Sequence, residues 1–124
     1  MAARVDAVSA NVFAYADPIW LRFSQPSHVG GWPEGAGVRS AQAGSRSAKF
    51  VLRLQVKGRQ ARFKAYGCPT AIAVGEWLCE QIEQNGLESM KAVSVEKIRA
   101  ALEISEDKSH CALLGEDLIR ALLK

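Results

Sequence analysis

Apolar and polar residues alternate over two neighbouring stretches in the middle of the chain. In residues 50–57 (FVLRLQVK) every second residue is a large apolar one, which predicts a β-strand with one face in the core. Residues 61–66 (ARFKAY) repeat the pattern, and Gly58-Arg59 between them predicts a tight hairpin turn. Residues 38–43 predict a weaker strand before them. We therefore expect a small antiparallel sheet of about three strands.

The second half of the chain has the spacing of helices. Apolar residues recur at intervals of three and four between residues 71 and 82, and Asn85-Gly86 predicts the end of this helix. Ser94 is a cap for a shorter helix, and a polar link over residues 105–109 precedes a last helix. This last helix is expected to run from about Cys111 to the carboxyl end.

The first part of the chain predicts a short helix and a long loop. Asp17-Pro18 predicts a helix start with Asp17 as the N-cap, and Gln25-Pro26 predicts its end. Residues 1–16 are expected to form a flexible or weakly helical extension, and residues 17–124 a single domain. Strands followed by helices indicate the α+β class, with the helices packed on one face of the sheet.

Composition narrows the class of protein. The chain has 124 residues, of which 48% are hydrophobic, and no apolar run has the length of a membrane helix. The amino terminus lacks the apolar segment of a secretory signal. Three widely spaced cysteines do not indicate a disulfide framework. We therefore expect a cytoplasmic protein that does not interact with membranes.

Charge is distributed unevenly along the chain. Residues 36–67 hold eight basic residues and no acidic one, whereas ten acidic residues face six basic ones from Cys68 onward. The basic residues alternate with apolar ones, which favours the solvated outer face of a sheet over a dedicated binding surface for an acidic partner. Aromatic residues are not interleaved as in RNA-binding sheets, so nucleic acid is not an expected partner.

Two cysteines are predicted to lie at helix starts. Pro69 suits the first helical position, which places Cys68 near the N-cap, and Cys111 follows His110 at the start of the last helix. Helix N-termini favour the thiolate, so both thiols are expected to have a lower pKa than a free cysteine. Cys79 lies eleven residues after Cys68, about 16 Å along a helix, and is expected to be a buried, slowly reacting apolar residue. Cys68, His110 and Cys111 form a candidate metal or sulfur site.

Three blocks of the sequence resemble one family. Residues 23–30 (FSQPSHVG) look like the "Y-x-N-P-R-N-V-G" segment of the U-type iron–sulfur cluster assembly scaffolds, IscU and the NifU amino-terminal domain. Residues 66–73 (YGCPTAIA) resemble their "Y-G-C-G-S-A-I-A", and residues 109–117 (SHCALLGED) their "H-C-S-x-L-A-E-D". The blocks occur in the family's order, and the resemblance covers about residues 18–123.

The resemblance implies a site that is incomplete in this chain. Members of the family assemble a [2Fe–2S] cluster on three cysteines, helped by an aspartate and a histidine. Two of the cysteines correspond to Cys68 and Cys111, and the histidine to His110. Ala48 takes the place of the first cysteine and Phe50 that of the aspartate, so the metal ligands implied for this chain are Cys68, His110 and Cys111.

The resemblance also implies partners. Family members receive sulfur from a cysteine desulfurase and pass the cluster to acceptor proteins. The segment that binds a dedicated chaperone, "L-P-P-V-K", corresponds to residues 104–108 (ISEDK), of which only Lys108 is retained. A [2Fe–2S] cluster usually has four protein ligands. This chain supplies three, which leaves the fourth to a partner protein or to a second subunit of a homodimer.

Three functions remain open at this point. The first is a divergent scaffold that binds iron or an iron–sulfur cluster and passes it on. The second is a module that binds zinc, which suits three thiolate or imidazole donors with an open fourth position, or that binds partners without metal. The third is a thiol protein that accepts persulfide sulfur on Cys68 or Cys111. The sequence contains no serine–histidine–acid set, phosphate loop or paired carboxylates, so we do not expect an enzyme.

Overall fold

The computed structural model describes residue 11, residues 14–35, 37–45 and 47, and residues 49–124. The predicted extension over residues 1–16 lies largely outside these residues. The described elements follow one another along the chain as α1 (Asp17–Ser24), β2 (Val38–Ser45), β3 (Phe50–Lys57), β4 (Gln60–Tyr66), α2 (Pro69–Asn85), η2 (Leu87–Ala92), α3 (Val95–Leu102), η3 (Glu106–Lys108) and α4 (Ser109–Leu123).

The described strands form one antiparallel sheet in the order β2-β3-β4. The β3–β4 hairpin pairs Lys57 with Gln60, which confirms the tight turn predicted at Gly58-Arg59. The backbone at Val29 pairs with Phe63 on the free side of β4, through the Gly30 N–H to Phe63 O (2.9 Å) and the Phe63 N–H to His28 O (2.9 Å). This contact covers part of an edge strand that would otherwise expose its hydrogen-bonding groups.

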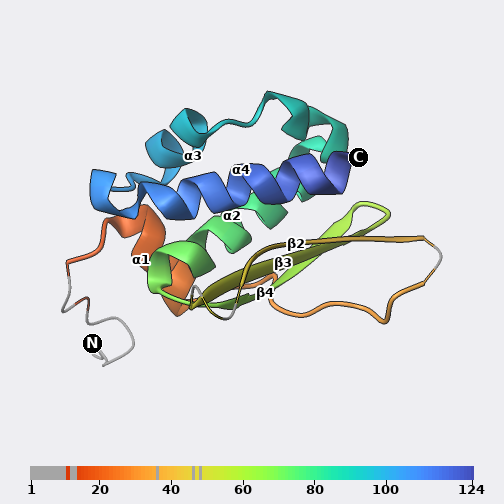
Figure 1. Ribbon diagram of the computed structural model, residues 1–124, viewed down its shortest axis with the longest axis horizontal. Coiled ribbons are helices and arrows are strands. Elements are labelled where there is room, and N and C mark those ends of the chain that lie inside the picture. The colour runs from red at the N-terminus through yellow and green to blue at the C-terminus, as the bar shows by residue number, and fades with distance from the viewer. Residues whose placement is uncertain (1–10, 12–13, 36, 46, 48) are drawn as a thin grey trace.

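The described helices pack over one face of the sheet, as predicted for the α+β class (Figure 1). The long segment between α1 and β2 runs along the other face in the same view. Between the layers lies a hydrophobic core with the alternating residues of β3 and β4 on one side and α2, α3 and α4 on the other. Its largest fully buried side chains include Phe63, Leu52, Leu54, Leu78, Ile82, Ile98, Leu102, Leu118 and Ile119.

Helix α2 approaches both of its neighbours closely at glycines. A Cβ added at Gly75 would lie 2.6 Å from Phe63 Cδ2 and 2.9 Å from Leu52 Cδ1. A Cβ added at Gly115 of α4 would lie 2.7 Å from Val74 Cγ1. These glycines therefore set how closely α2 packs between the sheet and α4, because a side chain at either position would push the layers apart.

Most predicted elements are confirmed, with two corrections at the level of single elements. Helix α1 begins at Asp17 with Ala16 as its N-cap, so the prediction of Asp17 as N-cap was wrong by one residue. The 3₁₀ helices η2 and η3 were not predicted, because neither short segment has a regular apolar spacing, and η3 lies in the predicted polar link. Helix α3 is capped by Ser94, whose side chain accepts the Lys97 N–H (3.2 Å), as predicted. None of the described helices is long and apolar enough to cross a membrane.

The outer face of the sheet is less solvated than the sequence predicts. Trp32 donates its backbone N–H to Gln55 Oε1 (2.7 Å), and Gln55 is buried. The Trp32 ring lies near two of the basic side chains, with Lys57 Nζ 6.0 Å and Arg62 Cζ 5.8 Å from its centroid. The loop before β2 thus covers part of the basic face, and the Trp32 ring makes cation–π contacts with these two side chains, of which Lys57 stays exposed.

A buried carboxylate holds the start of this loop on α2. Glu76 is 3% exposed, and its Oε1 accepts the backbone N–H groups of Ser27 (3.1 Å) and His28 (3.0 Å). Glu76 Oε2 lies 2.7 Å from His28 Nδ1, while Glu83 Oε1 lies 3.0 Å from His28 Nε2. Burial lowers the pKa of His28, but the bonds to Glu76 and Glu83 outweigh it, so the net shift is upward from 6.5. With a carboxylate on each ring nitrogen, the imidazolium form is favoured.

We expect the substitution Gly75→Ala to lower the free energy of unfolding by about 1 kcal/mol. Overpacking against Phe63 costs about 1–3 kcal/mol, which exceeds the roughly 1 kcal/mol gained from alanine in a helix. Urea unfolding measures the difference. Gly35→Ala is the matched control, since nothing lies within 4 Å of the added Cβ, and it should change the stability by less than about 0.5 kcal/mol. Equal effects of the two substitutions would contradict the close approach at Gly75.

We call the contacts of the His28 ring with Glu76 and Glu83 the His28 clamp. This clamp should make the free energy of unfolding depend on pH above neutrality. A raised pKa means that His28 stabilises the fold fully below its unfolded pKa of 6.5, and that this contribution is lost as the pH rises through the folded value. Wild type should therefore exceed His28→Gln in stability by more at pH 6 than at pH 8.5, as measured by urea unfolding.

The other histidine provides the control for this measurement. The chain has two histidines, so His110→Gln leaves His28 as the remaining imidazole. The pH dependence of wild type should persist in His110→Gln and be reduced in His28→Gln. A pH-independent difference between wild type and His28→Gln would show that His28 is not protonated in the clamp.

Candidate functional site

Cys68 lies where β4 passes into α2. Strand β4 ends at Tyr66, Cys68 is the N-cap of α2, and Pro69 is its first residue, as predicted. Gly67 between them has φ +150°, a conformation that favours glycine. A Cβ there would also lie 3.0 Å from Phe50 Cβ. The strand-to-helix junction therefore requires glycine at position 67 and presents the Cys68 thiol, which is half-buried, at the start of a helix.

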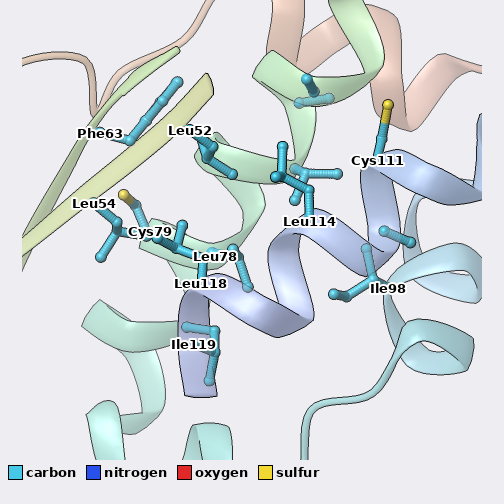
Figure 2. Packing of buried hydrophobic residues seen from close by; sticks show 14 of the residues in the cluster. Leu52, Leu54, Phe63, Leu78, Cys79, Ile98, Cys111, Leu114, Leu118 and Ile119 are labelled. Carbon is cyan, nitrogen blue, oxygen red and sulfur yellow. The ribbon is translucent and has the colours of Figure 1, made fainter. Parts of the chain in front are cut away.

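Cys111 reaches the same place from the far end of the chain. It is the third residue of α4, within the first turn, and it is 1% exposed. Its Sγ lies 3.8 Å from Cys68 Sγ, although the two residues are 43 positions apart. Figure 2 shows the Cys111 sulfur directed away from the apolar side chains of α4, such as Leu114. The fold thus brings the two thiols of the candidate site into contact.

The two thiols differ in acidity. Cys111 donates a hydrogen bond to Cys68, and this bond outweighs burial and lowers the pKa of Cys68 to about 5. The backbone N–H groups of Ala71 and Thr70 and the charge of Lys108 lower the pKa of Cys68 further. The same hydrogen bond and burial raise the pKa of Cys111. The prediction that both thiols are more acidic than a free cysteine was therefore right for Cys68 and wrong for Cys111, because only one of two thiols in contact can be the charged acceptor.

His110 lies beside the pair but faces another partner. Its ring packs against Phe50, with ring centroids 5.4 Å apart and planes tilted by 50°. Among the described residues, no three His, Cys, Asp or Glu side chains are grouped as a metal ion would need. The two thiols therefore converge, while the His110 ring packs on Phe50 and is not grouped with them. The resemblance placed residues 50 and 110 at one site, but no local pattern in the sequence indicated that their rings pack against each other.

The remaining positions singled out from the sequence have different outcomes. Ala48 falls outside the described residues, while Phe50 begins β3 next to Gly44, where an added Cβ would lie 2.4 Å from Phe50 O. Lys108 ends η3 immediately before α4. Cys79 is fully buried, as predicted, and burial raises the pKa of its thiol. It lies near Leu54 and Leu78 in Figure 2, remote from Cys111.

Alkylation by iodoacetamide should distinguish the three thiols. Cys68 should react fastest and with a midpoint near pH 5, because it is the acidic and half-exposed thiol. Cys79 and Cys111 should both react slowly, since each is buried with a raised pKa. Peptide mass spectrometry of samples quenched at different pH values measures the three rates.

Removal of Cys111 tests the cause of this acidity. Cys111→Ala takes away the hydrogen-bond donor, so the midpoint for Cys68 should move upward, whereas Cys111→Ser retains a donor and should move it less. Cys79→Ala is the control and should leave the midpoint unchanged. An unchanged midpoint in Cys111→Ala would mean that the helix start alone accounts for the acidity.

Comparison with solved structures supports the same architecture. An iron–sulfur cluster assembly scaffold assigned to the SUF system of thermophilic Fervidobacterium islandicum AW-1 has a TM-score of 0.65 to this chain, covering 93% of this chain and 100% of its own. The two sequences are 17% identical, so this likeness concerns the fold.

Relatives by sequence are closer. The Escherichia coli K12 protein named iron–sulfur cluster assembly scaffold protein IscU is 31% identical over 117 residues, covering 89% of this chain and 91% of its own. The protein of the same name from Azotobacter vinelandii is 30% identical over 118 residues, covering 90% and 92%. The model of the NifU-like N terminal domain matches residues 14–124. The chain therefore belongs to the family of NifU-like N-terminal domains.

Proposed function

We propose that this protein is a scaffold for iron–sulfur cluster assembly that binds iron or a cluster through Cys68 and Cys111 and passes it to acceptor proteins. The observation that carries the proposal is the contact between the two thiols at 3.8 Å. Membership of the NifU-like family and relatives named as IscU scaffolds support it. The cluster in this proposal is cargo that the protein delivers.

The spacing of the two sulfur atoms fits one tetrahedral metal. Two thiolates bound at about 2.3 Å to a tetrahedral metal lie about 3.8 Å from each other. The observed separation of Cys68 Sγ and Cys111 Sγ is 3.8 Å, so two of the four positions around a metal can be filled without rearrangement. The acidic Cys68 supplies one thiolate at neutral pH, and Cys111 loses its proton when the metal replaces the hydrogen bond.

The rest of the ligand set comes from outside this pair. His110 is the third donor that we propose, once its ring leaves Phe50. A fourth donor comes from a small thiol, a partner protein or a second subunit, because a [2Fe–2S] cluster usually has four. We therefore expect weak cluster binding by the isolated chain. Zinc, which accepts the same donors, is the competing metal.

The proposed partners follow from the family. A cysteine desulfurase supplies sulfur, and acceptor proteins take the cluster, in keeping with relatives that are named as assembly scaffolds. Lys108 is proposed as a contact for a partner, since it ends η3 at the rim of the site and its charge acts on Cys68. The cytoplasm is the proposed location.

Restoring the missing ligands tests the proposal. In the double variant Ala48→Cys plus Phe50→Asp, the added thiolate brings the number of possible donors to four. The Phe50 ring, which packs against His110, is also removed. We expect this variant to retain at least about tenfold more iron and sulfide than wild type after anaerobic reconstitution and gel filtration. Metal analysis reports iron, sulfide and zinc on the same sample.

Single cysteine variants provide the controls. Cys68→Ser should abolish binding in both backgrounds, whereas Cys79→Ala should leave it unchanged, because Cys79 lies in the core. Tight and equal cluster occupancy in wild type and double variant would contradict the argument that the number of donors limits cluster binding. Stoichiometric zinc without iron would favour the zinc-binding alternative.

A further inference from the structure

The Cys68–Cys111 pair has the geometry of a reactive dithiol as well as that of a metal-binding pair. All three described cysteines are free thiols, and two of them are in contact. Cys68 is half-buried and caps α2, whereas Cys111 is 1% exposed and lies beneath it. A sulfur-donating molecule therefore meets Cys68 first, and anything attached to Cys68 is next to a second thiol that solvent barely reaches.

We propose that this pair converts the outer sulfur of a persulfide into free sulfide, with the two cysteines as the source of electrons. The substrate class is a thiol persulfide, either a small molecule or the persulfide of a sulfur-donor protein. This activity goes beyond the proposed scaffold function because it needs no metal.

The first step transfers one sulfur atom to Cys68. The Cys68 thiolate attacks the outer sulfur of the persulfide R–S–SH, a bond forms between these two sulfur atoms, and the R–S bond to that outer sulfur breaks. The products are the persulfide Cys68–S–SH and the thiolate R–S⁻. The start of α2 stabilises the negative charge on sulfur at this position, since the N-terminus of a helix favours anions.

The second step uses the neighbouring thiol. Cys111 gives up its proton, and its sulfur attacks the inner sulfur of Cys68–S–SH, which was 3.8 Å away before the transfer. The Cys68–Cys111 disulfide forms and hydrosulfide, HS⁻, leaves with the electron pair of the broken bond. The transferred sulfur is reduced by two electrons, and the two cysteines are oxidised by two. Hydrosulfide is a weakly basic leaving group, which favours this direction of exchange.

The fold favours release over further transfer. Attack by Cys111 on the outer sulfur would only move the persulfide into the position of Cys111, which is 1% exposed. Attack on the inner sulfur instead expels the anion toward the half-exposed side of Cys68. A second turnover requires a dithiol reductant to reopen the disulfide, so one equivalent of sulfide per chain is expected without it.

A single-turnover experiment with glutathione persulfide tests the proposal. The reduced, metal-free protein carries Cys79→Ala, which leaves only the two thiols concerned, and is mixed anaerobically with the persulfide after removal of reductant. Sulfide trapped with monobromobimane should reach about one equivalent per chain above the protein-free blank, with intact mass showing loss of two hydrogens. Cys111→Ser should keep one added sulfur on Cys68 and release at least about tenfold less sulfide. Cys68→Ser should gain no sulfur.

The outcomes separate this inference from the scaffold function. A persulfide that stays on Cys68 or moves to Cys111 of the two-cysteine protein, with no disulfide and no sulfide, overturns the inference. Reconstitution of the same preparation with ferrous iron and inorganic sulfide tests the scaffold function independently. Cluster binding without sulfide release would contradict only the proposed conversion of persulfide to sulfide. Sulfide release without cluster binding would contradict only the proposed scaffold function. Peptide mapping of wild-type protein replaces intact mass if Cys79→Ala fails to fold.

Discussion

The close packing of α2 between the sheet and α4 is the constraint on which the site depends. Gly75 lets α2 approach Phe63 of β4, and Gly115 lets α4 approach Val74 of α2. These two close approaches fix the spacing of α2 from the sheet and from α4. The start of α2 and the first turn of α4 are therefore held next to each other, which brings Cys68 and Cys111 into contact. The thiol pair is therefore a product of core packing.

Phe50 occupies the position at which the resemblance to the family implies an aspartate. Phe50 packs against the His110 ring and lies close to Gly67 and Gly44, so it fills the space beside the thiols with apolar surface. An apolar neighbour makes the solvation of a bound metal less favourable and holds His110 in a fixed place. A reaction that needs only the two sulfur atoms is little affected by phenylalanine in place of aspartate, whereas cluster binding, which needs four metal ligands, is weakened.

Local pattern was enough to predict the strands, the α-helices and the two helix starts at the cysteines, but not the 3₁₀ helices. Alternation in β3 and β4, Pro69 after Cys68 and Ser94 before α3 each act within a few residues, and each is confirmed. Contacts between distant segments were not predictable in this way. The fold brings Phe50 to His110 and Glu76 to His28, and no local signal marked either pair, although a glutamate within an apolar helix face is a hint of a buried partner. The acidity of Cys111 was mispredicted for the same reason, because the helix start is local while its hydrogen bond to Cys68 is not.

The unequal burial of the two thiols decides how they share a proton. If each cysteine stood alone at its helix start, the pKa of each thiol would be lowered. Once the sulfur atoms are in contact, a negative charge on one raises the cost of a second charge on the other, so the two thiols do not lose their protons together. The half-exposed Cys68 keeps the charge because the start of α2 and Lys108 stabilise it, and the buried Cys111 keeps the proton. The site therefore presents one nucleophile and one proton donor in contact, an asymmetry that neither helix start would create alone.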